Sequence, residues 1–152
     1  MNTADINNAL QDLIIRLQDA EKGYKEIEKA TSNVSLKKWM DRYATERHKM
    51  HQKLEAHVKA SGHEANVKTS ILGDLHRMFI DIKLSATDDD FNPIVEEINR
   101  GSSQLIEDYE EVINKVEMPL NIKQDLIFQK GIIENEVEEL NILKKEFNTV
   151  TV

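Results

Sequence analysis

Residues 36–58 read LKKWMDRYATERHKMHQKLEAHV. The apolar residues of this stretch recur every three or four positions, which is the spacing of one face of an α-helix. They are Leu36, Trp39, Met40, Tyr43, Met50, Leu54 and Val58. Arg47 lies at the centre of the same face. The stretch therefore predicts a long amphipathic helix that carries a charged side chain toward the core.

The same periodicity continues on both sides of this stretch. It predicts helices at about 3–31, 35–60, 67–86, 93–116 and 121–147. Short turns near Asn33 and Met118 favour two helical hairpins, because helices joined by a few residues pack side by side in opposite directions. We therefore expect one domain over 1–152, an all-α antiparallel four-helix bundle in which 67–86 forms an additional crossover helix between the hairpins.

Composition excludes several classes of function. A net charge of -8 disfavours nucleic-acid binding, and the chain has no Cys for disulfides or thiolate metal sites. No apolar run approaches the roughly 20 residues that a membrane-spanning helix needs, and the first residues lack the pattern of a signal peptide. We therefore expect an acidic, cytoplasmic protein with neither nucleic acid nor membrane as a partner.

The expected interior contains a small group of charged residues. Counting from the first turn places Glu21 level with Glu46 and Arg47, so we expect an interior polar cluster in which Arg47 pairs with Glu21. The alternative is a carboxylate site for iron or another divalent metal. Its weak candidate ligands are Glu21, Glu28, Glu46 and Glu136. Di-iron bundles also use Glu-x-x-His pairs, and the sequence contains none. The interior ion pair is therefore the preferred interpretation, with no cofactor.

Two histidines lie three positions apart on the second predicted helix. His48 and His51, with Glu55 four residues further on, have a spacing that could hold Zn²⁺ or Ni²⁺ at the surface. Solvated helix residues are the simpler interpretation. The sequence alone leaves both open.

The predicted crossover helix is a candidate interaction surface. Leu72 and Phe79 widen its apolar stripe, and His76 lies between them along the chain. A broad apolar face of this kind could bind a second copy of the chain or another protein. Packing against the bundle is the alternative.

Several stretches together resemble a known family. They are Asp19-Ala-Glu-Lys-Gly-Tyr24, Glu46-Arg47, Leu75-His-Arg-Met-Phe-Ile-Asp-Ile-Lys83, Glu96-Glu-Ile-Asn-Arg-Gly101 and Tyr109. In order and spacing the chain resembles a bacterial ferritin-like family of four-helix bundles, classed as a domain of unknown function. The resemblance implies a ferritin-like architecture, related to rubrerythrins and other di-iron bundles, with degenerate metal-site positions.

The chain also departs from that family's pattern. Members commonly read Glu-Arg-Gly-Glu-Asp where this chain has Asn99-Arg-Gly-Ser-Ser103, and they often place a His near Val137. The chain also offers no Ser-His-Asp set and no glycine-rich phosphate loop. We therefore expect a non-catalytic interaction or stress-associated protein. The alternative is a di-iron-type carboxylate protein with an incomplete or unusual site.

Overall fold

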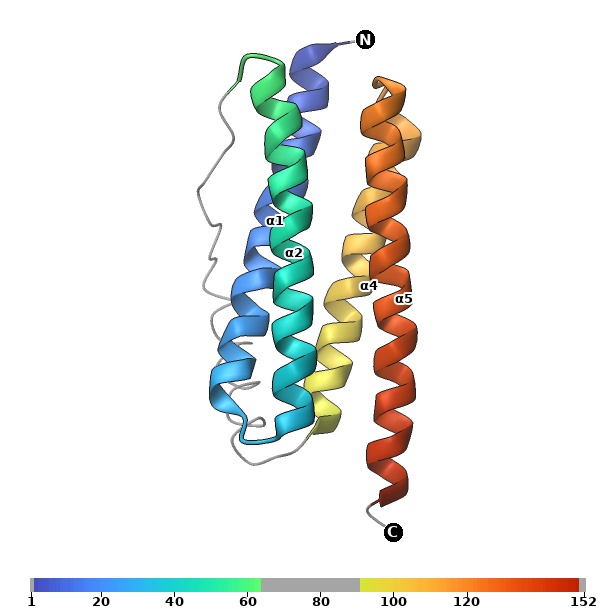
Figure 1. Ribbon diagram of the computed structural model, residues 1–152. Coiled ribbons are helices and arrows are strands. Elements are labelled where there is room, and N and C mark those ends of the chain that lie inside the picture. The colour runs from blue at the N-terminus through green and yellow to red at the C-terminus, as the bar shows by residue number, and fades with distance from the viewer. Residues whose placement is uncertain (1, 64–90, 151–152) are drawn as a thin grey trace.

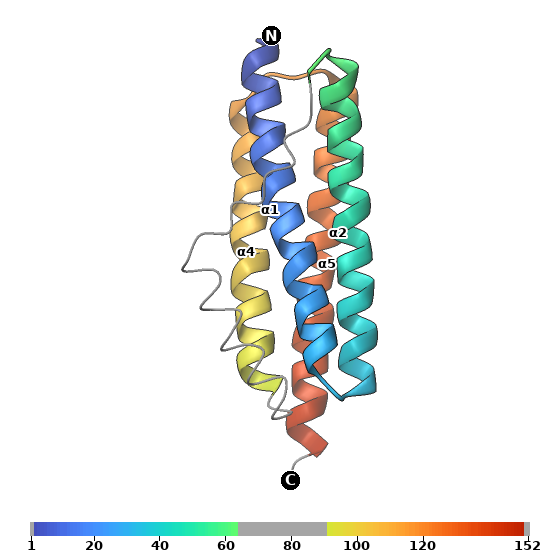
Figure 2. The same cartoon turned by 90° about the vertical axis from the view of Figure 1, so that its left-hand side faces the viewer.

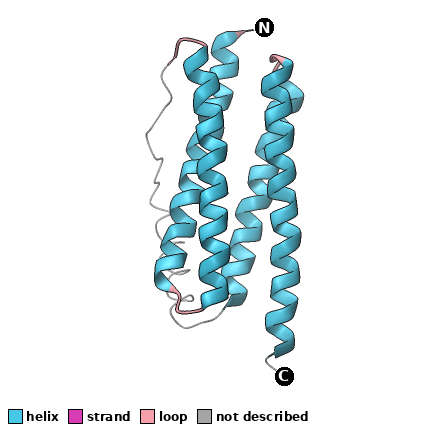
Figure 3. Cartoon of the chain, viewed as in Figure 1, coloured by secondary structure: helices cyan, strands magenta, loops and turns pink. Residues whose placement is uncertain are grey.

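The structure is a computed structural model that describes residues 2–63 and 91–150. These residues form four helices and no strand, in agreement with the predicted all-α class (Figure 3). The helices are α1 (Thr3–Ala30), α2 (Val34–Ala60), α4 (Phe91–Lys115) and α5 (Leu120–Val150). The predicted crossover helix at 67–86, with Leu72, His76 and Phe79, lies outside the described residues.

Local sequence signals set the ends of the first two helices. The side chain of Asn2 accepts hydrogen bonds from the backbone N–H groups of the first turn of α1, and Asn33 does the same for α2. Gly62, just beyond α2, has a φ of 85°, a left-handed conformation that favours glycine.

The four helices lie side by side along one axis (Figures 1 and 2). α1 and α2 are joined by residues 31–33 at one end of the assembly, and α4 and α5 are joined by residues 116–119 at the other end (Figure 1). α1 packs closely on α2, and α4 on α5, whereas α1 and α4 approach each other at few points. No described helix is apolar over a length that could cross a bilayer.

The core is divided into two apolar clusters. One lies toward the N-terminal half of α1 and contains Ile6, Leu10, Leu13, Ile14, Leu17, Met50, Leu54, Val58, Leu105, Tyr109, Met118, Leu126 and Ile133. The other contains Tyr24, Ile27, Leu36, Met40, Tyr43, Ala44, Ile94, Val95, Ile98, Leu140 and Leu143. All four helices contribute to both clusters. Between the two clusters, each helix has a short stretch that belongs to neither of them. These stretches contain the buried Arg47, Ser102 and Glu136. The interior thus has a polar layer at mid-length.

Candidate metal centre

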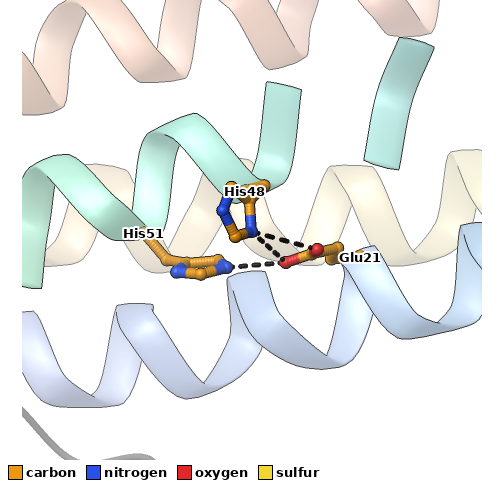
Figure 4. A group of neighbouring side chains, drawn as sticks. All are labelled: Glu21, His48 and His51. Atoms are coloured by element: carbon orange, nitrogen blue, oxygen red, sulfur yellow. Dashed lines mark hydrogen bonds and ion pairs between the residues drawn. The ribbon is translucent and has the colours of Figure 1, made fainter. Parts of the chain in front are cut away.

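Two helices bring three metal-ligating side chains together at their seam. His48 and His51 lie one turn apart on α2, and both rings face Glu21 on α1 (Figure 4). His51 Nε2 is 2.6 Å from Glu21 Oε1, and His48 Nδ1 is 3.1 Å from Glu21 Oε2. One ligand atom from each residue can be chosen so that all three lie within 4.8 Å of one another. Among the described residues this is the cluster whose geometry could hold a metal ion.

The cluster lies at the edge of the bundle core. The side chain of His51 is 8% exposed and that of Glu21 is 12% exposed, whereas that of His48 is 48% exposed. His51 also points its other ring nitrogen, Nδ1, at Glu55 Oε1 at 3.0 Å. Two of the three ligands are therefore held in place by packing and hydrogen bonds, and the third leaves the site open to solvent.

Without a metal, the Glu21 carboxylate is held by cationic and N–H groups. Lys25, one turn along α1, approaches Glu21 Oε2 at 2.9 Å. Burial alone would raise the pKa of Glu21, but hydrogen bonds from Lys25, His51 and His48 outweigh it and lower the pKa to about 2. The carboxylate is thus ionised throughout the neutral range, which is the state that binds a cation.

The donor set has a recognisable coordination chemistry. Two imidazoles and one carboxylate suit Zn²⁺ and Fe²⁺, whereas Mg²⁺ and Ca²⁺ prefer sites made of oxygen. Zn–N and Zn–O bonds of about 2.0–2.2 Å in a tetrahedron separate neighbouring donors by roughly 3.3 Å. The present contacts of 2.6 and 3.1 Å reach different oxygens of Glu21 and are shorter than that spacing, while one donor atom from each residue can be chosen within 4.8 Å of the others. Small side-chain rotations would therefore admit an ion with a fourth position open to water.

The interior charge pair differs from the one expected from the sequence. Arg47 is fully buried as predicted, but its carboxylate partner is Glu136 on α5, with Nη2 and Oε2 2.6 Å apart. The predicted pair of Arg47 with Glu21 is therefore wrong. Arg47 points into the polar layer between the hairpins, whereas Glu21 turns outward along the α1–α2 seam. Adjacent positions on one helix differ by about 100° in direction, so Arg47 and His48 serve different sites.

A second carboxyl group adjoins this pair. Glu46 interacts with Glu136 through its side chain, and Arg42 approaches Glu46 Oε1 at 3.4 Å from the surface. Burial raises the pKa of Glu136 to about 8, against the Arg47 charge, which lowers it, and the contact with Glu46 contributes to the rise.

The predicted carboxylate ligands are distributed between two places. Glu21 belongs to the group formed with His48 and His51 at the α1–α2 seam, which we call the seam cluster. Glu46 and Glu136 lie in the polar layer, where the Arg47 guanidinium fills the space beside Glu136. Glu28 is half-buried near the end of α1 and belongs to neither group. The predicted set of four carboxylates therefore does not converge on one ion.

The sequence singled out the two histidines and Glu55 but did not indicate the contact of the histidines with Glu21. It linked His48 and His51 to Glu55 through their spacing on one helix. The structure confirms that Glu55 contacts His51, through Nδ1, and it adds Glu21, from the other helix, at Nε2. The signal was available in principle, because Glu21 had been counted level with Glu46 and Arg47, immediately before His48.

Comparison with known proteins identifies the family. No curated protein and no solved structure gives a significant match to the chain. The family described as a domain of unknown function (DUF2383) matches residues 5–115, from the start of α1 to the end of α4. That range contains all three residues of the seam cluster but not Glu136. The match covers most of the sequence, and the chain therefore belongs to the DUF2383 family of domains of unknown function.

Proposed function

We propose that this protein is a divalent-metal-binding helical bundle whose ligands are Glu21, His48 and His51. The observation that carries the proposal is the meeting of two imidazoles and one carboxylate, from two helices, within 4.8 Å. Zn²⁺ is the ion that the three-ligand set and its partly open geometry suit best. This develops the metal-binding alternative drawn from the sequence, with a different and smaller ligand set.

The site would act mainly by linking the two helices of the first hairpin. Glu21 lies on α1 and both histidines lie on α2, so an ion bound to all three joins the helices near mid-length. An ion that binds only the folded state stabilises it by RT ln(1 + [ion]/Kd), which is about 2.7 kcal/mol at 100 times Kd. His48 leaves one side open, so an exogenous ligand could complete the coordination.

A metal centre in the bundle interior is not part of this proposal. A di-metal centre needs several carboxylates and imidazoles around two cations. Arg47 already supplies a fixed positive charge beside Glu136, and that guanidinium would repel an incoming cation. The seam cluster has no such competitor except Lys25, whose flexible and exposed side chain can move away.

Elemental analysis tests the proposal directly. The protein is produced with zinc, iron and manganese available, purified without chelator, and then titrated with Zn²⁺ after metal removal. We expect one ion per chain, its loss in Glu21→Ala, and its retention in Glu28→Ala, which removes the same charge from the same helix two turns away. A wild-type protein that carries no metal and does not bind Zn²⁺ in the titration would overturn the proposal.

We also propose the finer architecture and setting that the sequence suggests. The two short connections and the family match support an antiparallel, ferritin-like bundle with a crossover helix between its hairpins. The sequence resemblance supports a bacterial source, and the absence of Cys is compatible with the reducing cytoplasm. An experimental structure that covers residues 64–90 tests the architecture, and a crossover without a helix would contradict it.

A second candidate function is the non-catalytic interaction role expected from the sequence. The observation in its favour is a set of exposed apolar side chains on α5. They are Leu120, Ile127 and Phe128, which share one helix face by their spacing of seven and eight positions. Phe128 is 70% exposed. The partner proposed is a second copy of the chain, and light scattering on wild type and Phe128→Glu decides it, because a monomeric wild type would exclude this role.

A further inference from the structure

The residues behind His51 carry an inference that rests on the proposed metal-binding function. His51 uses both ring nitrogens, Nε2 toward Glu21 and Nδ1 toward Glu55. A neutral imidazole has one N–H, so it can offer a lone pair to a metal from one nitrogen only if the other carries the hydrogen. Whatever accepts that hydrogen therefore decides which nitrogen faces the ion.

Glu55 is placed to be this acceptor. It lies one turn beyond His51 on α2, and its Oε1 is 3.0 Å from His51 Nδ1. The same oxygen accepts a hydrogen bond from Gln18 Nε2 on α1 at 3.2 Å. The Glu55 carboxylate is thus held from two helices and is only 21% exposed. If an ion replaces the hydrogen on Nε2, a carboxylate fixed in this way can hold the hydrogen that stays on Nδ1 and keep the ring in one orientation.

We propose that Glu55, held by Gln18, is the positioning residue of the metal site. It accepts the Nδ1–H of His51 and so presents the Nε2 lone pair to the ion between Glu21 and His48. Carboxylate–histidine–metal arrangements of this kind raise the basicity of the ligand, and removal of the carboxylate weakens metal binding by roughly 10–100-fold. Glu55 itself does not contact the ion in this arrangement.

The test compares Zn²⁺ affinity across four variants by competition with a chromogenic chelator. Glu55→Ala should bind Zn²⁺ roughly 10–100-fold more weakly than wild type. Glu55→Gln keeps an acceptor oxygen but loses the charge, so its affinity should fall between the two. Gln18→Ala should weaken binding less than Glu55→Ala, because Glu55 can still reach His51. Glu111→Ala, which removes a charge from the exposed surface of α4, serves as the control and should match wild type.

A spectroscopic measurement separates positioning from general loss of structure. In Zn²⁺-loaded protein, ¹⁵N NMR of the His51 ring should show coordination through Nε2 and a slowly exchanging Nδ1–H. In Glu55→Ala that hydrogen should exchange rapidly while the helical circular dichroism stays unchanged. If Glu55→Ala fails to fold, the affinity of Glu55→Gln decides.

The outcomes distinguish this inference from the proposed function. Wild-type protein that binds Zn²⁺ together with a Glu55→Ala variant of equal affinity would overturn the positioning role and leave the metal site standing. Wild-type protein that does not bind Zn²⁺ would overturn both. A weakened Glu55→Ala variant with the NMR change would support both.

Discussion

Charged residues gather in two neighbouring regions of the protein that differ in their access to solvent. In the polar layer, Arg47 and Glu136 are shielded from water and hold each other at 2.6 Å. At the seam, Glu21 contacts two histidines and a lysine at similar distances, but part of the cluster faces solvent. The buried pair is closed to solvent, whereas the seam cluster is partly exposed and is the proposed site, at which an ion would displace Lys25. Solvent access thus separates a structural group from a candidate binding site.

Removal of one member of the buried pair should have the largest effect. Arg47→Leu leaves the Glu46–Glu136 carboxyl groups without their cation in a place that water does not reach. Breaking a buried ion pair destabilises a protein by about 3–5 kcal/mol, and urea unfolding measures the change. The double variant Arg47→Leu/Glu136→Leu is the control, because it replaces both members of the contact with apolar side chains and should recover most of the loss. If Arg47→Leu were as stable as wild type, the result would show that water reaches the polar layer.

The pH dependence of stability should come from the polar layer. The pKa of Glu136 is about 8 in the folded protein and near 4.5 in the unfolded chain, so the folded state binds this proton more tightly. Its contribution to stability is complete below pH 4.5, declines as the pH rises, and is lost above about pH 8. One pKa unit corresponds to about 1.4 kcal/mol, so the difference between 4.5 and about 8 corresponds to a decline of roughly 5 kcal/mol.

Unfolding by urea at several pH values between 5 and 9 measures this decline. Glu136→Gln, which cannot titrate, should flatten the curve, whereas Glu21→Gln should leave this alkaline decline in place. Equal slopes for wild type and Glu136→Gln would contradict the assignment of the proton to this carboxyl pair.

Loss of a ligand at the seam should change metal binding more than it changes stability. His51→Ala removes the buried proposed ligand that contacts Glu55, so Zn²⁺ affinity should fall roughly 100-fold or more, beyond the effect of removing Glu55, which would not touch the ion. His48→Ala should weaken binding less, because its side chain is 48% exposed and packing holds it less firmly than that of His51. His57→Ala is the matched control, since His57 lies on the same helix but pairs with Asp125. Calorimetric titration with Zn²⁺ gives the three affinities, and equal values for all would exclude the seam as the site.

The smallest expected effect concerns the lysine that competes with the ion. Lys25→Met removes a largely exposed partner of Glu21, so stability should fall by only about 0.3–0.5 kcal/mol. An exposed ion pair is worth about 0.2–1 kcal/mol, which converts to a gain in Zn²⁺ affinity of at most about fivefold. Lys29→Met removes a charge one turn further along and should leave affinity unchanged. Weaker binding in Lys25→Met would show that Lys25 supports the site instead of competing for it.

Much of the fold could be predicted because it depends on local patterns. Apolar residues at steps of three and four define α1, α2, α4 and α5 to within a few residues, and Asn33 and Gly62 fix two of the ends. The burial of Arg47 was also predictable, since it interrupts the apolar face of α2. Each of these properties follows from the order of residues along one helix.

The partners of the charged residues depended on the tertiary structure. The sequence placed Arg47 in the interior but could not show that Glu136, 89 positions away on another helix, would be its partner. The sequence indicated that His48 and His51 lie on one side of α2. It did not show that Glu21, from α1, contacts these histidines and the exposed Lys25. Helix periodicity fixes which side of a helix a residue occupies. Which residue faces it from another helix depends on the rotation and offset of the two helices, and only their packing sets these.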